Sequence, residues 1–514
     1  MAENLASFKV FCQGGLNTSR DVLSQGETQP GSAIALINYE PAVTGGYRKI
    51  NGFSNDYGTV TGTGKVLGVC VANGINDGIL ACRTPSSGNN YLHKWNSTTS
   101  AWDAVTTVGS PTMTGVTKVR FTKYNWSSPK VLLTDGINPA ATYDGTTYTQ
   151  ITHTNAPSAP KLSAVYKSTV FLAGDPSEPT LLYYGPYLQD TNWDKALGGD
   201  VINVGFPIVA LKTFRNVLYI FGTNQIKSFV FDDPSSQIPN VQSVTDDLGC
   251  LATDSVIEIG GDLLFLSQDG LRPISGTDKI GDVNLETVSK DIQSIFTDII
   301  FDIDLEGLNS VVIRQKTQFR YFFAGADTQG IIGGFRLTPD GLQFEYGQML
   351  GITATCAASG YIGQNEYVIH GTSDGKVHRQ ETGNSFDGED IFSLFQTPFY
   401  HMQDPEQRKI FYTVATYLRS EGDNQIIMSA VYDYEDVNIL SPSNFTLTTT
   451  GAAAYYNEAL YDATAIYDGN PSPVQRTNIS GSGKSASFRF VTSDSNSSHS
   501  IQGLVVTFGV GDRL

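Results

Sequence analysis

The residue types best suited to bind a metal or attack a substrate are spread thinly along this chain. No two of its six histidines lie three or four residues apart, so the sequence predicts no zinc-binding pair on a helix face. The five cysteines are odd in number and widely spaced, which is typical of buried thiols rather than a disulfide framework. These residues are His93, His153, His370, His378, His401 and His499, and Cys12, Cys70, Cys82, Cys250 and Cys356. We expect neither a metal site nor a cofactor.

Two short motifs imitate ligand-binding loops. Residues 302–307 begin like a calcium loop, but the position that should supply its closing carboxylate is Ile313. Residues 483–485 read Gly-Lys-Ser, as at the end of a phosphate-binding loop, but Asn478 replaces the first glycine of that motif. No Gly-x-Ser-x-Gly nucleophile elbow occurs. The sequence therefore predicts no catalytic residue and no enzyme.

One enzymatic alternative remains open. Paired acids such as Asp246-Asp247 and Glu389-Asp390 are expected on turns, where water solvates them. Acids carried by separate sheets of a β-propeller can still form a glycosidase site. However, the chain has no Ser-x-Asp-x-Gly-x-x-Trp repeat of the sialidase kind. A propeller glycosidase is kept as the least favoured function.

The elements that must position any site are predicted to be β-strands. The 514 residues include 52 glycines, only 16% are charged, and β-branched and aromatic types are plentiful, as in pleated sheets joined by tight turns. Seven similar units, each with a very apolar strand, recur at the spacing of propeller blades. They span residues 66–82, 118–143, 164–184, 210–231, 256–274, 311–337 and 361–380. We predict an all-β protein with a propeller of six or seven blades, and stacked sandwiches are the alternative.

The remaining segments differ from these units. Apolar residues at helical spacing predict one amphipathic helix within residues 286–300, packed in the core or docked on a neighbouring subunit. Alternating strands after residue 400, interrupted by a polar stretch over about 441–483, predict a C-terminal β-sandwich. The Gly-rich first 60 residues are interpreted as an arm that needs a partner surface. The predicted domains are thus an arm (1–60), a propeller (61–400) and a sandwich (401–514).

Charge and hydropathy limit the partners and the location. The formal net charge is −18 and the basic residues are scattered, which disfavours tight binding of nucleic acid. DNA that passes without being held is compatible with this charge. No apolar run is long enough to span a bilayer. The first twenty residues lack a signal-peptide pattern, so we expect synthesis in a cytoplasm.

Both ends of the chain resemble a known family. The N-terminal motifs are Gly14-Gly15-Leu16-Asn17, Gly26-Glu27, Ala35-Leu36-Ile37-Asn38-Tyr39-Glu40, Gly45-Gly46-Tyr47-Arg48-Lys49 and Gly52-Phe53. The C-terminal ones are Phe488-Arg489-Phe490 and Ile501-Gln502-Gly503-Leu504-Val505-Val506. This pattern resembles the tail stabilisation, or nozzle, proteins of short-tailed bacteriophages over about the first 55 and last 30 residues. Lys49 stands where these proteins usually carry a second arginine, which keeps the charge but weakens a bidentate contact there.

The resemblance implies a structural virion protein. Members of that family form a ring of six below the portal and adaptor rings, extend the tail tube, gate the DNA exit and anchor fibres or spikes. Such a chain would be a homohexamer in the virion tail, made in the bacterial host cytoplasm. We expect Tyr47, Arg48, Lys49 and Phe53 to contact the adaptor ring or a neighbouring subunit, or else to close the propeller and pack on the sandwich. The competing function is a free-standing propeller that binds a glycan or a peptide at its central face.

Overall fold

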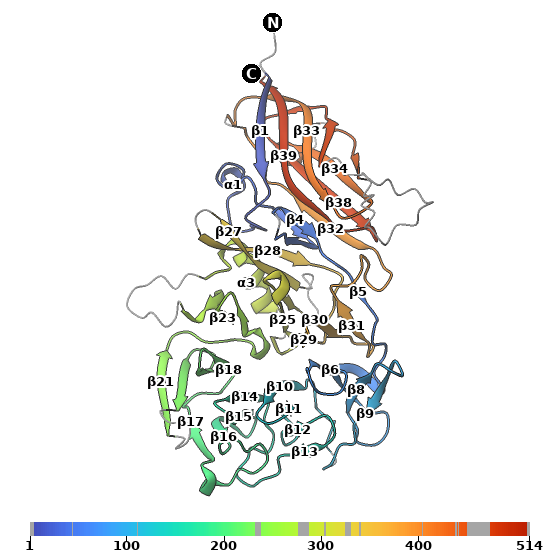
Figure 1. The fold of residues 1–514 in the computed structure, drawn as a ribbon. Helices are drawn as coiled ribbons and strands as arrows, with labels where there is room; N and C mark the ends of the chain where they lie inside the picture. The colour runs from blue at the N-terminus through green and yellow to red at the C-terminus, as the bar shows by residue number, and fades with distance from the viewer. Residues whose placement is uncertain are drawn as a thin grey trace.

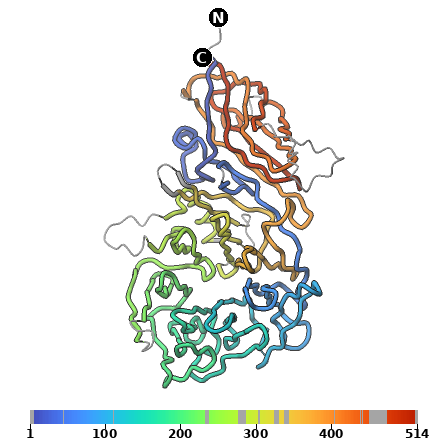
Figure 2. The backbone as a smooth tube through the Cα atoms, in the orientation of Figure 1, coloured from blue at the N-terminus to red at the C-terminus, as the bar shows by residue number. Residues whose placement is uncertain are grey.

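The computed structural model divides the protein into a ring of sheets and a two-sheet unit beside it (Figures 1 and 2). It describes residues 5–43, 45–109, 111–231, 238–275, 287–302, 305–323, 330–338, 341–402, 404–436, 439, 441–449 and 473–510. The structure is dominated by β-strands, as the sequence predicts. Part of the polar stretch at 441–483 and the start of the predicted helix lie outside the described residues.

The ring, in the lower part of Figure 1, consists of seven antiparallel sheets, which we call blades 1 to 7. Blades 1, 2, 3, 4 and 7 are separate four-stranded sheets, blade 5 has three strands, and blade 6 is the first four strands of a nine-stranded sheet. Blade 1 is β6 (Thr63–Val71), β7 (Ile79–Thr84), β8 (Leu92–Asn96) and β9 (Ala101–Ala104), and blade 2 is β10 (Arg120–Asn125), β11 (Pro129–Thr134), β12 (Ala141–Tyr143) and β13 (Tyr148–Gln150). Blade 3 is β14 (Leu162–Tyr166), β15 (Thr169–Asp175), β16 (Glu178–Tyr184) and β17 (Asp200–Asn203), and blade 4 is β18 (Ala210–Phe214), β19 (Val217–Phe221), β20 (Ile226–Phe231) and β21 (Pro239–Thr245).

The last three blades complete the ring. Blade 5 is β22 (Ile257–Ile259), β23 (Asp262–Ser267) and β24 (Gly270–Pro273). Blade 6 is β25 (Asn309–Ile313), β26 (Gln318–Phe322), β27 (Gly330–Thr338) and β28 (Gly341–Met349). Blade 7 is β29 (Cys356–Ile362), β30 (Asn365–Gly371), β31 (Val377–Gln380) and β5 (Phe53–Ser54). Each of the seven sequence units falls in one blade, so the propeller prediction is confirmed.

Hydrophobic clusters lie between successive blades. Val131 of blade 2 packs with Leu80 of blade 1, for example, and both side chains are fully buried. Equivalent clusters fill the other gaps, and the gap between blades 5 and 6 merges with the largest core. One small twisted sheet cannot bury both of its faces, so stacking the blades radially is what removes their apolar side chains from water.

Two features close the ring and turn the chain between strands. The outer strand of blade 7, β5, comes from the N-terminal segment and pairs with β31, so residues distant in sequence join at this seam. Two turns between blade strands contain Asp-Gly pairs, Asp77-Gly78 and Asp374-Gly375, and their glycines have φ of +86° and +88°. A side chain at either position would be strained.

The two-sheet unit, in the upper part of Figure 1, is joined to blade 6. One sheet continues from β28 through β2 (Ala35–Ile37), β32 (Ile391–Gln396), β38 (Ala486–Asp494), β34 (Asn424–Tyr432) and β35 (Phe445–Thr449). The other contains β1 (Leu5–Phe11), β3 (Tyr39–Pro41), β4 (Tyr47–Lys49), β33 (Lys409–Ser420), β36 (Val474–Asn478), β37 (Ser482–Gly483) and β39 (His499–Val510). Both sheets contribute to the largest hydrophobic core, which includes Phe395 and Leu504.

The helices are short. The predicted amphipathic helix is present as η3 (Lys290–Ile292) followed by α3 (Gln293–Asp302), and Ile292, Phe296 and Ile299 are buried in the largest core. The others are α1 (Val22–Thr28), η1 (Lys195–Leu197), η2 (Thr253–Ser255), η4 (Leu305–Gly307), η5 (Arg314–Lys316) and η6 (Asp433–Glu435). Within the described ranges, no helix is long and apolar enough to cross a membrane.

The first 60 residues do not form a detached arm. They supply β1, β3 and β4 to one sheet of the upper unit, β2 to the other sheet, and β5 to blade 7. The first and last strands lie side by side, with β1 antiparallel to β39 from Leu5–Gly509 to Phe11–Gly503 (Figure 2). The partner surface that this segment needs is thus largely provided by its own chain.

Candidate functional site: the central channel of the propeller

The first strand of each blade faces the centre of the ring. Together β6, β10, β14, β18, β22, β25 and β29 surround a cavity of about 530 Å³. This volume lies within the range of ordinary ligand pockets. Because strands from every blade line it, the cavity is the channel along the propeller axis.

Side chains of the innermost strands hold neighbouring blades together. Hydroxyl or ammonium groups on one blade donate hydrogen bonds to backbone carbonyl oxygens on the next, which satisfies groups at strand edges that would otherwise be unpaired. The bonds are Thr122 Oγ1 to Ser163 O (3.1 Å), Thr213 Oγ1 to Val165 O (3.0 Å), Lys123 Nζ to Val71 O (3.0 Å) and Thr355 Oγ1 to Val66 O (2.8 Å). Hydrogen bonds therefore link neighbouring blades around the channel wall.

An ion-pair cluster spans the channel. Arg120 at the start of β10 donates from Nη2 to Asp254 Oδ2 at 2.7 Å, and Lys118 Nζ lies 2.7 Å from the same oxygen. Lys118 also donates to the carbonyl oxygen of Leu308 at 2.9 Å. Arg120 belongs to β10 of blade 2, whereas Asp254 belongs to η2 before blade 5, so these contacts connect blades that are not neighbours. Burial opposes ionisation of Asp254, but the charges of Lys118 and Arg120 outweigh it and hold its pKa well below the usual range.

A second ion pair connects other non-adjacent blades. Lys161, just before β14 of blade 3, pairs with Glu306 of η4, just before β25 of blade 6. All four segments that carry these pairs lie at or near the beginning of innermost strands, and the innermost strands run in the same direction along the axis. The salt bridges therefore cross the channel at one of its ends.

Lys212 differs from the other channel cations. It lies in the middle of β18 and lines the cavity. In the part of the chain that the structure describes, its amino group has no hydrogen bond or ion pair. Burial lowers the pKa of Lys212, the charge of Glu258 raises it, and the nearby cations Arg314 and Lys123 lower it again.

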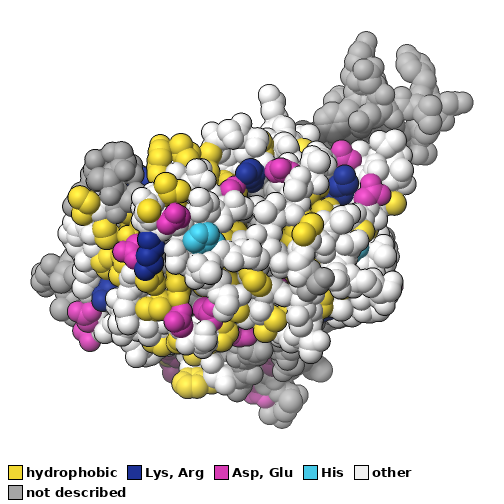
Figure 3. All heavy atoms as spheres, turned by 90° about the horizontal axis from the view of Figure 1, so that it is seen from below, with side chains coloured by type: hydrophobic (Ala, Val, Ile, Leu, Met, Phe, Trp, Pro, Cys, Tyr) yellow, Lys and Arg dark blue, Asp and Glu magenta, His cyan; other side chains and the backbone are white. Residues whose placement is uncertain are grey.

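The charge of the channel is opposite to that of the whole protein. Its lining includes four basic residues, Lys118, Arg120, Lys123 and Lys212, and two acidic ones, Asp254 and Glu258, a difference of +2. The whole chain has a formal charge of −18. On the face seen in Figure 3, by contrast, basic and acidic side chains are interspersed. An anion therefore meets a more favourable environment inside the channel than the net charge suggests.

The described lining residues offer hydrogen-bonding groups, and the thiols among them are not activated. Its two thiols, Cys70 and Cys356, are buried, and burial raises their pKa to about 12 and about 11, so both stay protonated at neutral pH. Among the described residues, no cluster of three or more His, Cys, Asp or Glu could hold a metal. What the lining supplies is hydroxyl, carbonyl and ammonium groups suited to hydrogen bonding.

The residues expected at an adaptor or subunit interface lie elsewhere. Tyr47 is fully buried, and its hydroxyl donates to the Gly31 carbonyl oxygen at 2.7 Å and accepts from the Gly15 amide at 3.0 Å. Lys49 is equally buried and pairs with Asp494 at 2.6 Å. These two side chains make their polar contacts inside their own chain.

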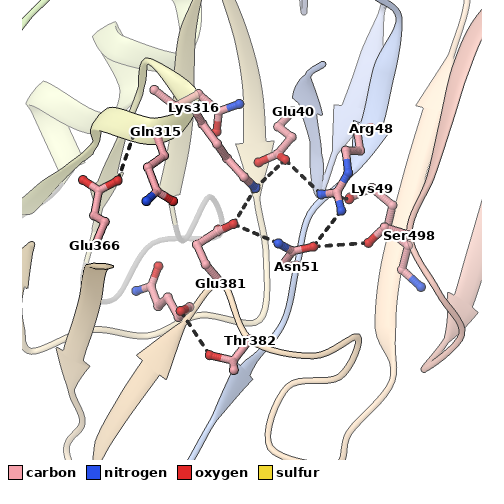
Figure 4. Close-up of polar contacts among 12 residues, drawn as sticks. Glu40, Arg48, Lys49, Asn51, Gln315, Lys316, Glu366, Glu381, Thr382 and Ser498 are labelled. Carbon is pink, nitrogen blue, oxygen red and sulfur yellow. Dashed lines mark hydrogen bonds and ion pairs between the residues drawn. The ribbon is translucent and has the colours of Figure 1, made fainter. Parts of the chain in front are cut away.

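Arg48 belongs to a partly buried ionic network between the two-sheet unit and blades 6 and 7 (Figure 4). We call it the junction cluster, and its members are Glu40, Arg48, Lys316, Arg320, Glu381 and Glu421. Arg48 binds both carboxylate oxygens of Glu421 at 2.6 Å and reaches Glu40 at 3.1 Å. Three cations face three carboxylates, so the cluster is balanced and ties the two parts of the molecule together.

Phe53 sits on the closing strand β5. Its ring stacks on Phe386 with centroids 5.0 Å apart and lies edge-on to His370 and His378. The geometry accounts for all four predicted interface residues as contacts within the chain. Their contact with an adaptor or a neighbouring subunit stays a prediction, since no second chain is present.

Sequence reasoning missed Lys118, Arg120, Lys212 and Asp254. A signal was available, because Lys118 and Arg120 begin one predicted unit and Lys212 lies at the start of another. Had the first strand of each unit been assigned to the channel, its charged residues would have been candidates. Asp254 carried no such signal, because it lies in a short 3-10 turn between units.

Comparisons with known proteins add little to this geometry. No protein-family model and no curated protein matches the chain. Among solved structures, Hsv2 of Kluyveromyces lactis with loop 6CD replaced by a Gly-Ser linker is 11% identical over 53% of this chain and 81% of that chain, with a TM-score of 0.33. The same protein with a complete loop 6CD is 9% identical over 56% and 98%, also with a TM-score of 0.33. The fold assignment rests on the blades described above.

Proposed function

We propose that this protein is a non-catalytic binding module whose ligand enters the central channel of the propeller. The observation that carries the proposal is the polar cavity of about 530 Å³ surrounded by the innermost strands of all seven blades. Rigid walls lower the entropy cost of binding because the site does not have to be ordered first. The protonated, buried thiols support binding rather than covalent chemistry.

A peptide is favoured over a glycan as the ligand. Sugar rings commonly stack on aromatic side chains, and Phe121 is the one aromatic residue among the described residues that line the channel. The lining instead offers Thr and Ser hydroxyls and cations, which match the polar groups of a peptide. A short peptide segment is therefore the ligand that the channel chemistry supports best.

Blocking the channel tests this function. Ser359 on β29 lines the cavity, and all five native cysteines are buried, so a thiol reagent should modify mainly a Ser359→Cys variant at the new thiol. The intact chain is first screened on peptide and glycan arrays, and the selected ligand is titrated against Ser359→Cys before and after modification with a bulky maleimide. Modification should abolish binding.

Thr99→Cys, in the exposed turn between β8 and β9, is the matched control and should bind normally after modification. Retained affinity in modified Ser359→Cys would contradict a channel site. A glycan selected in place of a peptide would leave the channel function intact and overturn the choice of ligand.

A subunit of a phage tail nozzle is the second candidate, and one observation favours it. One segment from each of the two chain ends that resemble that family meets the other in a single sheet, where β4 pairs with β39, and β1 pairs with β39 as well. The outer face of this sheet exposes apolar side chains: Leu5 and Ile410 flank Gly509, and Phe11 and Tyr417 flank Gly503. A ring of six subunits would give this face a partner, and the adaptor ring, fibres or spikes would be further contacts.

Native mass spectrometry of the purified protein, alone and with a candidate adaptor, tests the second candidate. A closed ring of six copies would support it. A monomer at all concentrations that does not join an adaptor ring would exclude it. This outcome is independent of the channel, so the two candidates can be separated.

A further inference from the structure

Lys212 is placed where a ligand would meet it. It lies in the middle of β18 and lines the cavity together with Asp254 of the ion-pair cluster and Glu258 of β22. The other channel cations already have acceptors: Arg120 and Lys118 share Asp254, and Lys123 donates to Val71 O. Among described residues, Lys212 has neither a hydrogen bond nor an ion pair.

Holding a charged ammonium group in a confined channel costs free energy unless an anion lies close to it. Water that enters the channel solvates it in part, but the surrounding cations Lys123 and Arg314 repel it. Glu258 and, more weakly, Asp254 attract it, but among the described residues neither carboxylate forms an ion pair with it. A ligand carboxylate next to Lys212 would supply an anion at hydrogen-bonding distance, which Glu258 does not.

We propose that an acidic side chain, Asp or Glu, of the bound peptide enters the channel and pairs with the Lys212 amino group. This inference rests on the proposed binding function and adds the chemical class of the ligand. Thr213 and Ser163, which also line the cavity, are committed to contacts between blades, so Lys212 is the group that selects for charge. The rest of the peptide would lie along the strand edges of the channel wall.

The experiment measures Kd for matched ligands. The array-selected acidic peptide is compared with the same peptide in which Gln replaces its Glu, or Asn its Asp. Lys212→Met removes the charge at similar volume, and Lys212→Arg retains it. For the wild-type chain, the acidic peptide should bind about 10- to 100-fold more tightly than its amide counterpart. The difference should largely disappear in Lys212→Met and persist in Lys212→Arg.

Controls separate this inference from the binding function itself. Lys195→Met, at an exposed site paired loosely with Asp200 at 3.5 Å, should leave both affinities unchanged. Equal affinity of the wild-type chain for both peptides would overturn the role of Lys212 while leaving the channel function standing. An undiminished preference for the acidic peptide in Lys212→Met would overturn it too.

Two further probes identify the source of the negative charge. Inorganic phosphate alone should compete only at far higher concentration than the peptide, and an oligogalacturonate should not compete. Phosphate binding as tight as the peptide would show that a free anion is the ligand, and tight, Lys212-dependent binding of the oligogalacturonate would assign the site to acidic glycans. Either result would overturn the peptide proposal.

Discussion

The guanidinium of Arg120 and the carboxylate of Asp254 meet across the central channel, with Nε 3.1 Å and Nη2 2.7 Å from carboxylate oxygens. Arg120 belongs to blade 2 and Asp254 to the turn before blade 5, and these blades are not adjacent, so their contact connects separate parts of the ring. Lys118 adds a second cation to the same carboxylate. This end of the channel is thus crossed by charged side chains.

Removing the Asp254 charge should destabilise the propeller. The Asp254→Asn variant leaves Lys118 and Arg120 without their carboxylate. We expect it to lower the free energy of unfolding by about 2–3 kcal/mol, because the two cations would remain largely buried without a counterion. Denaturant titration measures the change. Asp200→Asn, in an exposed pair with Lys195, is the control and should alter stability by less than about 0.5 kcal/mol.

Protonation of Glu381 should weaken the junction cluster in acid. Burial opposes ionisation of Glu381, but the charges of Arg320 and Lys316 outweigh it and lower the pKa to about 2. Its contribution to stability is therefore complete above the ordinary value of 4.5 and is lost as the pH falls toward 2. Glu381→Gln should cost about 2–3 kcal/mol at pH 7 and much less at pH 2. A cost that is equal at both pH values would contradict this assignment.

His370 should contribute to acid destabilisation in a different pH range. Burial and the neighbouring charges of His378 and Arg320 lower its pKa from 6.5 to about 3. The unfolded chain takes up a proton below pH 6.5 while the folded chain does not, so stability falls as the pH drops from 6.5 toward 3. His370→Gln should flatten the stability curve by about 2 kcal/mol between pH 7 and pH 5. Equally steep curves for the two proteins would refute the prediction.

Loss of the Phe53 ring should loosen the seam of the propeller. Phe53→Ala removes contacts with Phe386, His370 and His378, and we expect a loss of about 2–4 kcal/mol. Hydrogen exchange should accelerate in β31, the strand that pairs with β5. If Phe53 instead docks on an adaptor or a neighbour, the variant will keep its stability and exchange rates and lose assembly alone.

The repeat pattern predicted the blades because it is local in sequence. A very apolar strand recurs in each unit, and an Asp-Gly pair in the turn that follows it, as at Asp77-Gly78 and Asp374-Gly375, favours a hairpin locally. The helix was located by its apolar spacing, and its buried Phe296 bears out the core-packing interpretation. These features depend on neighbouring residues, which is why the sequence alone reveals them.

Pairings between residues far apart in the sequence could not be predicted from local patterns. Nothing local indicates that Phe53 of β5 completes a blade more than 300 residues later, or that Arg48 meets Glu421. The interpretation of residues 1–60 as an arm followed from their high glycine content, whereas pairing with distant strands is what orders this segment. The channel charges were hidden for the same reason, because Arg120 and Asp254 come together only when the ring closes.

The structure of the chain bound to its array-selected peptide would test the central claim most directly. The account predicts peptide density inside the channel, between β10 and β18, with an acidic side chain of the ligand within hydrogen-bonding distance of the Lys212 amino group. Density on the outer edges of the blades or on the two-sheet unit, with an empty channel, would contradict it.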